Sequence, residues 1–244
     1  RETWNHNGGL TFNHEETVRR CPGRDKDGCF YQGKIWRDHT VEPFTNLQPG
    51  WDPDATNMDE VFGRITDFTS LPTADYCALE RNISTLDRVP YMLPDTHQQL
   101  MLEEGGSESV RLEKPFTWTR RFVFVKSPDP LGPQYLVMRD HLGGNIELNP
   151  ALNLWCLADA LAMNGQTATF TGQHGVNLDI YVAEPAAFTH RTHQVGHTNG
   201  RQMSKYYQQT FGKPFKEEQT LFQIPQKPGG GYFVALVPRR HADA

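Results

Sequence analysis

The stretch Phe116–Val125 (FTWTRRFVFV) decides the fold class, because bulky apolar residues recur in it at a period of two. Alternate side chains of an extended strand point to opposite faces of a sheet. Trp118 and Phe122 therefore share one face with Arg120, whereas Arg121 lies on the other face. This period predicts a β-strand with two different faces.

A second strand is expected at Tyr135–Arg139 (YLVMR). The residues that separate the two strands, Ser127–Pro133, include prolines, which cannot donate a hydrogen bond to a β-ladder. The two strands are therefore expected to form a hairpin with a long loop. At the end of the second strand, we expect Asp140 either to orient the imidazole of His141 or to cap a turn.

Further runs of strand-forming residues lie on both sides of this hairpin, separated by turns rich in Gly, Pro, Asn and Asp. They are Leu10–Phe12, Val61–Phe68, Asp75–Asn82, Ser109–Leu112, Thr167–Phe170, Leu178–Val182, Gln219–Ile224 and Tyr232–Pro238. The run Ala151–Met163 (ALNLWCLADALAM) fits either a helix or, around Asn153–Leu157, a buried strand. Lys205–Gln209 is a candidate for a short helix.

Many short strands and little helical periodicity predict an all-β fold, namely an antiparallel multi-stranded β-sandwich of stacked, supersandwich-like sheets. Strands and helices do not alternate along the chain, which disfavours a parallel α/β fold. A chain of 244 residues can bury a sizeable core. We expect a single β-sandwich domain over 1–244, with residues 37–60 as an irregular surface excursion because they show no clear period.

Composition excludes several classes of protein. Lys and Arg number 24 and Asp and Glu number 29, so the net charge is −5, which argues against binding to nucleic acid through phosphate attraction. No apolar run reaches the length of about 20 residues that a membrane-spanning helix needs. Gly229-Gly230-Gly231 is followed by no Lys-Ser/Thr pair, so we interpret it as a hairpin tip and not as a phosphate-binding loop.

The four cysteines, Cys21, Cys29, Cys77 and Cys156, permit two disulfides in three pairings, or four free thiols. Cys21 and Cys29 flank a polar loop and would be able to close it in an oxidising compartment.

The spacing His190-x-x-His193-x-x-x-His197 is a candidate pattern for a metal site. An extended strand would point His190 and His193 to opposite faces, so the two cannot share a metal without a bend. We therefore interpret this segment as a polar loop.

Several of these motifs, in this order, resemble the heparinase II/III-like polysaccharide lyases. Arg1–Phe12 (RETWNHNGGLTF) is similar to the His-Asn strand of that family, with Gly8-Gly9 as a local departure. The similarity continues through most of the chain in short motifs. These are Gly63–Phe68, Ala74–Tyr76, Thr119–Val125, Tyr135–Asp140, Asn153–Trp155 and Leu178–Pro185.

The resemblance implies that this chain is the C-terminal β-sandwich domain, with an N-terminal helical toroid supplied elsewhere in the protein or by a separate chain. Such lyases cleave uronate-containing polysaccharides by β-elimination. A base removes the C5 proton, donors neutralise the uronate charge, and the 4-linked oxygen departs. The family draws these groups largely from the toroid, so this chain by itself is expected to be inactive. A secreted or periplasmic location is expected.

The resemblance also implies a metal ligand. His6 matches a histidine that often binds zinc in the family, although its usual His and Asp partners have no counterpart here and structural zinc takes about four ligands. The alternative is a hydrogen-bonded histidine at a strand end.

Two functional hypotheses follow. The first is the sandwich part of a lyase that acts on an anionic polysaccharide, and the second is a non-catalytic carbohydrate-binding or assembly module. In either case Trp36, directly before the excursion, and Trp51, within it, are candidate sugar-stacking residues, with ordinary packing as the alternative. Arg121 is a candidate contact for an acidic sugar, with a solvated surface charge as the alternative. The unpaired edges of an open sandwich predict association into a homo-oligomer.

Overall fold

The computed structural model describes residues 10–13, 29–31, 34–36, 46–49, 55–88, 109–129, 131–144, 146, 148–172, 175–196, 209 and 218–243. In this part of the chain nearly all regular structure is antiparallel β-sheet. The strands, in chain order, are β1 (Leu10–Asn13), β2 (Cys29–Tyr31), β3 (Lys34–Trp36), β4 (Asn46–Pro49), β5 (Arg64–Leu71), β6 (Ala74–Arg88), β7 (Ser109–Val125), β8 (Tyr135–Gly143), β9 (Asn149–Asn164), β10 (Thr167–Gly172), β11 (Val176–Glu184), β12 (Arg191–Gly196), β13 (Glu218–Pro225) and β14 (Tyr232–Arg240). Two short helical turns, α2 (Met58–Val61) and η2 (His241–Asp243), accompany them. The predicted all-β fold class is confirmed.

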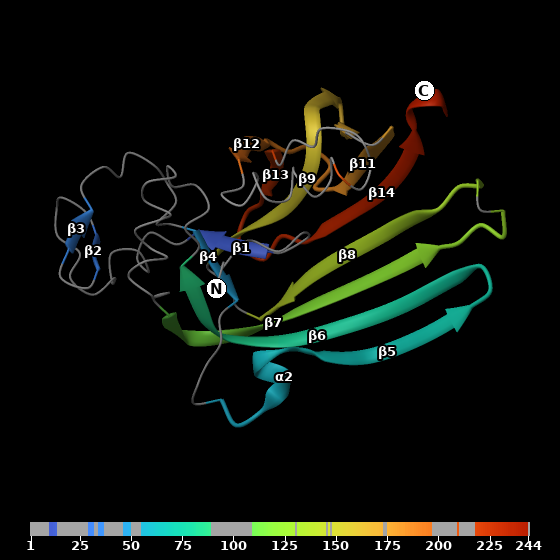
Figure 1. Cartoon of the computed structure of the whole chain (residues 1–244). Helices are drawn as coiled ribbons and strands as arrows, with labels where there is room; N and C mark the ends of the chain where they lie inside the picture. The colour runs from blue at the N-terminus through green and yellow to red at the C-terminus, as the bar shows by residue number, and fades with distance from the viewer. Residues whose placement is uncertain are drawn as a thin grey trace.

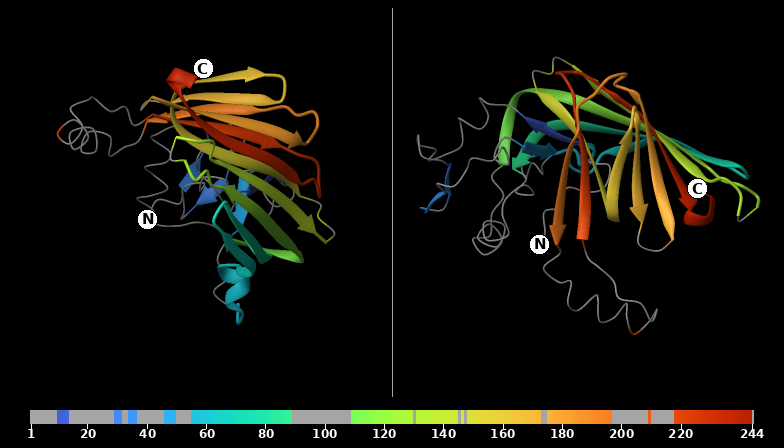
Figure 2. Two further views of the ribbon diagram at one scale, coloured as in Figure 1. Left: turned by 90° about the vertical axis from the view of Figure 1, so that its right-hand side faces the viewer. Right: turned by 90° about the horizontal axis from the view of Figure 1, so that it is seen from above.

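A single 12-stranded sheet forms both layers of the molecule. Its strand order is β1-β4-β6-β7-β8-β14-β11-β10-β9-β13-β12, with β5 paired to β6, while β2 and β3 form a separate two-stranded sheet. In Figure 1, strands β5 to β8 make the lower layer, and β9, β11 and β14 belong to the upper layer. The pairing of β8 with β14 joins the two layers, so the stacked layers are halves of one sheet that bends over on itself (Figure 2).

Strand β1 closes one end of this bent sheet. Leu10–Asn13 pairs with Asn149–Leu152 of β9 on one side, and Phe12 and Asn13 pair with β4 on the other. β4 in turn pairs with the end of β6. The layers therefore meet at β1 and β4 and diverge toward the opposite end (Figure 1).

The hydrophobic core lies between the two layers, where every second residue of each strand points. Ile83 and Phe116 from the lower layer and Phe170, Ile180 and Phe222 from the upper layer are all buried. Phe222 packs edge-to-face against Phe170, with ring centroids 6.4 Å apart.

Tyr232 of β14 adds a polar tie inside this core. Its buried hydroxyl is 3.0 Å from the carbonyl oxygen of Pro150 and 2.8 Å from that of Ile224. Burial raises the pKa of this phenol far above its ordinary value, and the charge of Asp140 adds to the shift. The side chain therefore remains a neutral hydrogen-bond donor.

Each predicted strand is present, but Val61, expected to begin one of them, belongs to α2, and that strand begins at Arg64. The expected strands Ser109–Leu112 and Phe116–Val125 are parts of the single 17-residue strand β7, and Ala151–Met163 lies in strand β9, not in a helix. The hairpin tip at Gly229 is confirmed, because this glycine adopts a φ of 69° between β13 and β14. Of the helix candidate Lys205–Gln209, all but residue 209 lies outside the described residues.

Two predictions of irregular structure were wrong where the chain is described. Residues 37–60, expected to be an irregular surface excursion, contain regular structure where they are described, namely strand β4 and the start of α2. The segment that holds His193, expected to be a polar loop, is strand β12, which pairs with β13. Both strands are short and largely polar. In the described part of the chain, no helix has the length and apolar character that crossing a membrane requires.

Candidate functional site

The two faces of strands β7 and β8 differ, because the inner face holds a buried ion pair and the outer face holds exposed cationic side chains. On the inner face, Asp140 accepts two hydrogen bonds from Arg120, from Nε and Nη2, each at 2.6 Å. The indole Nε1 of Trp118 donates a third at 3.2 Å. The Arg120 guanidinium also lies 4.8 Å from the centroid of the Trp118 ring. This buried group is structural, because both carboxylate oxygens are already occupied.

Both expected roles of Asp140 were therefore wrong. Strand β8 continues to Gly143, so Asp140 caps no turn. Neighbouring residues of a strand face opposite sides. His141 is accordingly exposed on the outer face, whereas Asp140 is buried. The carboxylate orients Arg120 and Trp118, and not the imidazole.

The outer face of the same two strands holds a cationic groove, which we call the β7–β8 groove. Its volume is about 300 Å³, and its lining consists of Thr119, Arg121, Arg139 and His141. The register explains this grouping, because Thr119 pairs with His141 and Arg121 pairs with Arg139 across the two strands. Directly opposed side chains in an antiparallel pair lie about 5 Å apart at Cβ. Two guanidinium groups and one imidazole thus share one small surface.

The charges of the two arginines are only partly balanced. Arg139 Nη2 lies 3.8 Å from Glu184 Oε2, and both side chains are exposed. The Arg139 guanidinium also lies 5.8 Å from the ring centroid of Phe233, which pairs with it from β14. Within the described part of the chain, Arg121 forms no salt bridge. Like charges that face each other directly across two strands repel, so this pair favours an anion between them.

The groove has the chemistry of an anion-binding site. A guanidinium group donates in a planar fork that fits a carboxylate or a sulfate. Thr119 and His141 supply a hydroxyl and an imidazole that exchange hydrogen bonds with neutral hydroxyl groups. Phe233 is 38 % exposed beside Arg139, which places an aromatic ring at the border of the groove. Charged groups, hydroxyl partners and an aromatic ring are what a sugar acid needs.

Of the site residues predicted from sequence, Arg121 is the one whose surroundings are described, and it lies in this groove. Trp36 is the last residue of β3, but its side chain lies outside what is described. Trp51 and His6 lie outside the described residues altogether. Arg139 and His141 were not recognised as partners of Arg121. The available signal was their position in the second strand of the predicted hairpin, two residues apart.

The structure describes only some of the residues on which the metal and disulfide predictions depend. Among the described residues, no group of three or more His, Cys, Asp or Glu is arranged to hold a metal ion. Cys77 and Cys156 are free thiols. Cys21 lies outside the described residues, and of Cys29 only the strand β2 is described. His190 contacts Phe222, with ring centroids 5.7 Å apart, and His197 lies outside the described residues.

Comparison with known proteins gives a weak structural similarity. No protein-family model and no curated protein matches this chain. Crystal structures of the heparan sulfate lyase HepC from Pedobacter heparinus are similar at 13 % sequence identity. One has a TM-score of 0.43 and covers 88 % of this chain and 28 % of that chain. A mutant of the same lyase has a TM-score of 0.41 and covers 73 % and 22 %. The chain thus spans about a quarter of the length of these structures.

Proposed function

We propose that the β7–β8 groove binds an anionic polysaccharide, and that this chain is the β-sandwich part of a heparinase II/III-like lyase. The observation that carries the binding proposal is the direct pairing of Arg121 with Arg139 on an exposed face. A carboxylate or sulfate between the two guanidinium groups would relieve their repulsion and accept hydrogen bonds from both.

The surroundings of this pair favour a sugar over a simple inorganic anion. The exposed ring of Phe233 offers an apolar surface to a pyranose ring, as aromatic side chains in sugar sites do. Thr119 and His141 lie on the same two strands and face the same groove. An acidic sugar would therefore place its charge between the arginines and its hydroxyl groups toward Thr119 and His141.

In the lyase proposal, this face holds the polymer, and groups outside this chain perform the elimination. The acid and base that remove the C5 proton and protonate the 4-linked oxygen would come from the helical toroid, as the resemblance of the sequence motifs implies. The second candidate is a non-catalytic module that binds the same polymer, and the β7–β8 groove supports both candidates equally.

A binding experiment with matched variants tests the groove. The probe is heparan sulfate, with uncharged dextran as the comparison polymer and calorimetry as the measurement. We expect Arg121→Gln with Arg139→Gln to weaken heparan sulfate binding by about tenfold or more and to flatten its dependence on salt. The control double variant Lys227→Gln with Arg240→Gln removes the same charge from exposed positions elsewhere. Equal affinity of the two double variants would overturn the proposal, as would equal binding of dextran.

A second experiment separates the lyase from the non-catalytic module. The protein is assayed together with a toroid segment, and the ultraviolet absorbance of the unsaturated product is followed. Product formation that falls in the groove double variant supports the lyase. Binding without product, in the presence of a folded toroid, supports the non-catalytic module.

A further inference from the structure

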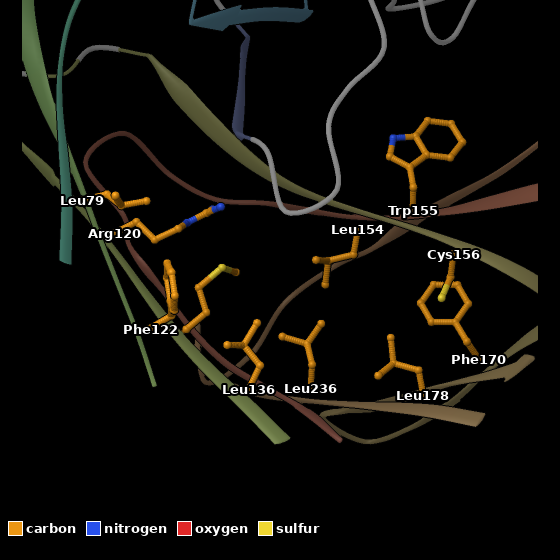
Figure 3. A pocket seen from close by; sticks show the side chains of 11 residues that line it. Leu79, Arg120, Phe122, Leu136, Leu154, Trp155, Cys156, Phe170, Leu178 and Leu236 are labelled. Atoms are coloured by element: carbon orange, nitrogen blue, oxygen red, sulfur yellow. The ribbon is translucent and has the colours of Figure 1, made fainter. Parts of the chain in front are cut away.

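A second cavity lies between the two layers and is separate from the β7–β8 groove. Its volume is about 370 Å³, and strands of both layers line it. Figure 3 shows Phe122 and Leu136 from the lower layer and Leu154, Leu178 and Leu236 from the upper layer around this space. These residues belong to β7, β8, β9, β11 and β14.

This cavity is far larger than a packing defect. Protein interiors contain few voids larger than one water molecule. An apolar cavity of roughly 150 Å³ is enough to bind one benzene ring and remains dry when empty. The space between the layers is more than twice that size, so it has room for a guest molecule.

Water in this space finds few hydrogen-bonding partners. An ordered interior water needs two to four polar partners. The charged side chain among the described lining residues is Arg120, whose guanidinium already donates to both oxygens of Asp140. An apolar molecule needs no hydrogen-bonding partners, so the lack of such groups in the lining costs it nothing.

The cavity is accessible to a small molecule. Phe122, Leu136, Leu178 and Leu236 all face the interior, yet each is only half-buried. Apolar side chains that face a closed core are normally buried completely, as Ile180 and Val234 are on the same two upper strands. The partial exposure of these four leucine and phenylalanine side chains indicates that the cavity opens to solvent.

We propose that this cavity binds a neutral, apolar small molecule with the bulk of about two aromatic rings. Its charge would be zero because Asp140 already neutralises Arg120, so no free charge remains at the described lining to pair with an ionised group. The driving force is the removal of apolar surface from water, both on the ligand and on the partly exposed leucines. The inner cavity and the outer groove lie on opposite faces of β7 and β8, so this proposal stands independently of polysaccharide binding.

The test uses the 244-residue chain and the neutral fluorophore N-phenyl-1-naphthylamine, which carries two aromatic ring systems, a naphthalene and a phenyl, and becomes fluorescent in apolar surroundings. We expect saturable binding of one probe per chain. Leu236→Trp would fill the cavity and weaken this binding by about tenfold or more. The matched control is Val237→Trp, the next residue of β14, which faces the opposite side of the sheet. It should leave probe affinity within about twofold.

Non-saturable binding, or equal affinity in the two tryptophan variants, would overturn the proposal. A readout on the unmodified protein decides the matter if Leu236→Trp does not fold. Cys156 lines the cavity as a free thiol, so bound probe should slow its alkylation. Burial raises the pKa of this thiol, so the reaction is run at mildly alkaline pH and mapped by mass spectrometry. An unchanged alkylation rate at saturating probe would contradict the proposed occupancy.

Discussion

Arg120 and Asp140 face each other across β7 and β8 as a bidentate ion pair. Both nitrogen–oxygen distances are 2.6 Å. The Asp140 side chain is fully buried, and that of Arg120 is 14 % exposed. The pair lies on the inner face, at the lining of the cavity, while Arg121 and Arg139 occupy the outer face of the same strands. Two neighbouring arginines of one strand thus have entirely different environments.

Removal of the Asp140 charge should destabilise the protein strongly. Asp140→Asn leaves the Arg120 guanidinium without its counter-charge, and breaking such a buried pair typically costs about 3–5 kcal/mol. Urea unfolding followed by circular dichroism measures the change. The matched control is Asp75→Asn, which breaks the pair between Lys126 and Asp75, where both side chains are 29 % exposed. A loss at Asp140 no larger than that at Asp75 would contradict the structural role of the buried pair.

The hydroxyl of Tyr232 should contribute measurably to stability. Tyr232→Phe removes the hydrogen bonds to the carbonyl oxygens of Pro150 and Ile224, and unsatisfied buried polar groups cost about 1–3 kcal/mol. The midpoint of urea unfolding should fall accordingly, with an unchanged slope. Tyr181→Phe, at a side chain that is 47 % exposed, is the control and should leave the midpoint unchanged. Equal midpoints for the two variants would refute the contribution of the Tyr232 hydroxyl to stability.

Asp179 should make the free energy of unfolding depend on pH in the acidic range. Burial by itself would raise the pKa of this carboxyl, but hydrogen bonds from Arg239 and Thr169 outweigh burial and hold the pKa below the ordinary value of 3.8. Arg239 Nε lies 2.5 Å from Asp179 Oδ2, and Thr169 Oγ1 lies 2.6 Å from Oδ1. The carboxylate therefore binds fewer protons in the folded state than in the unfolded state near that pH.

Since the folded pKa is lowered, the stabilisation is fully present above the unfolded pKa and is lost as pH falls through the folded pKa. We expect Asp179→Asn to be less stable than the parent by about 2 kcal/mol at neutral pH, as for hydrogen bonds to a charged group. The gap in unfolding free energy between the two proteins should narrow below pH 3.8. Urea unfolding at a series of pH values measures this gap, and a constant gap down to the acid transition would argue against the assignment.

Arg121 should weaken the fold slightly while it strengthens binding. Like charges directly opposite each other on two strands are destabilising by about 0.2–1 kcal/mol. Arg121→Gln should therefore raise the unfolding midpoint slightly at low salt, and this gain should shrink as salt screens the repulsion. The same variant should bind heparan sulfate more weakly. A variant that loses both stability and binding would show that Arg121 is a structural residue.

Much of the fold could be predicted because it depends on local pattern. The period of two in Phe116–Val125 correctly separated the inner residues Trp118, Arg120 and Phe122 from the outer residue Arg121. Short strands with turns between them predicted the antiparallel arrangement. These properties are encoded within a few neighbouring residues, so one sequence is enough to read them.

Two of the strands that sequence analysis missed, β4 and β12, depend on partners outside their own residues. Strand β4 (NLQP) has little intrinsic preference for extended structure, and it pairs with β1 and β6, which are far from it in sequence. Strand β12 (RTHQVG) is polar, and among the described strands it lies at an edge of the sheet and pairs with β13 alone. Neither partner can be inferred from the residues of the strand itself.

The candidate site was found only in part for the same reason. Arg121 could be selected as an outward-facing cation, but its pairing with Arg139 depends on the register of the hairpin. A long loop with several prolines separates the two strands, and such a loop does not determine a register from sequence. The role of Asp140 was misjudged because its partners, Arg120 and Trp118, lie on the preceding strand and not beside it in sequence.

Strand β1 bridges two segments that are remote in sequence. Its four residues hold β4 on one side and β9 on the other, although some 140 positions along the chain separate Leu10 from its partner Leu152. Contacts between such remote segments form late and slowly, because a large loop must be closed before they are gained. We therefore expect the hairpins within each layer to form before β1 pairs with β9. A polypeptide that starts after Asn13 would retain the hairpins, but β4 and β9 would both lack their shared neighbour β1. The two layers would then no longer be connected at that end of the bent sheet.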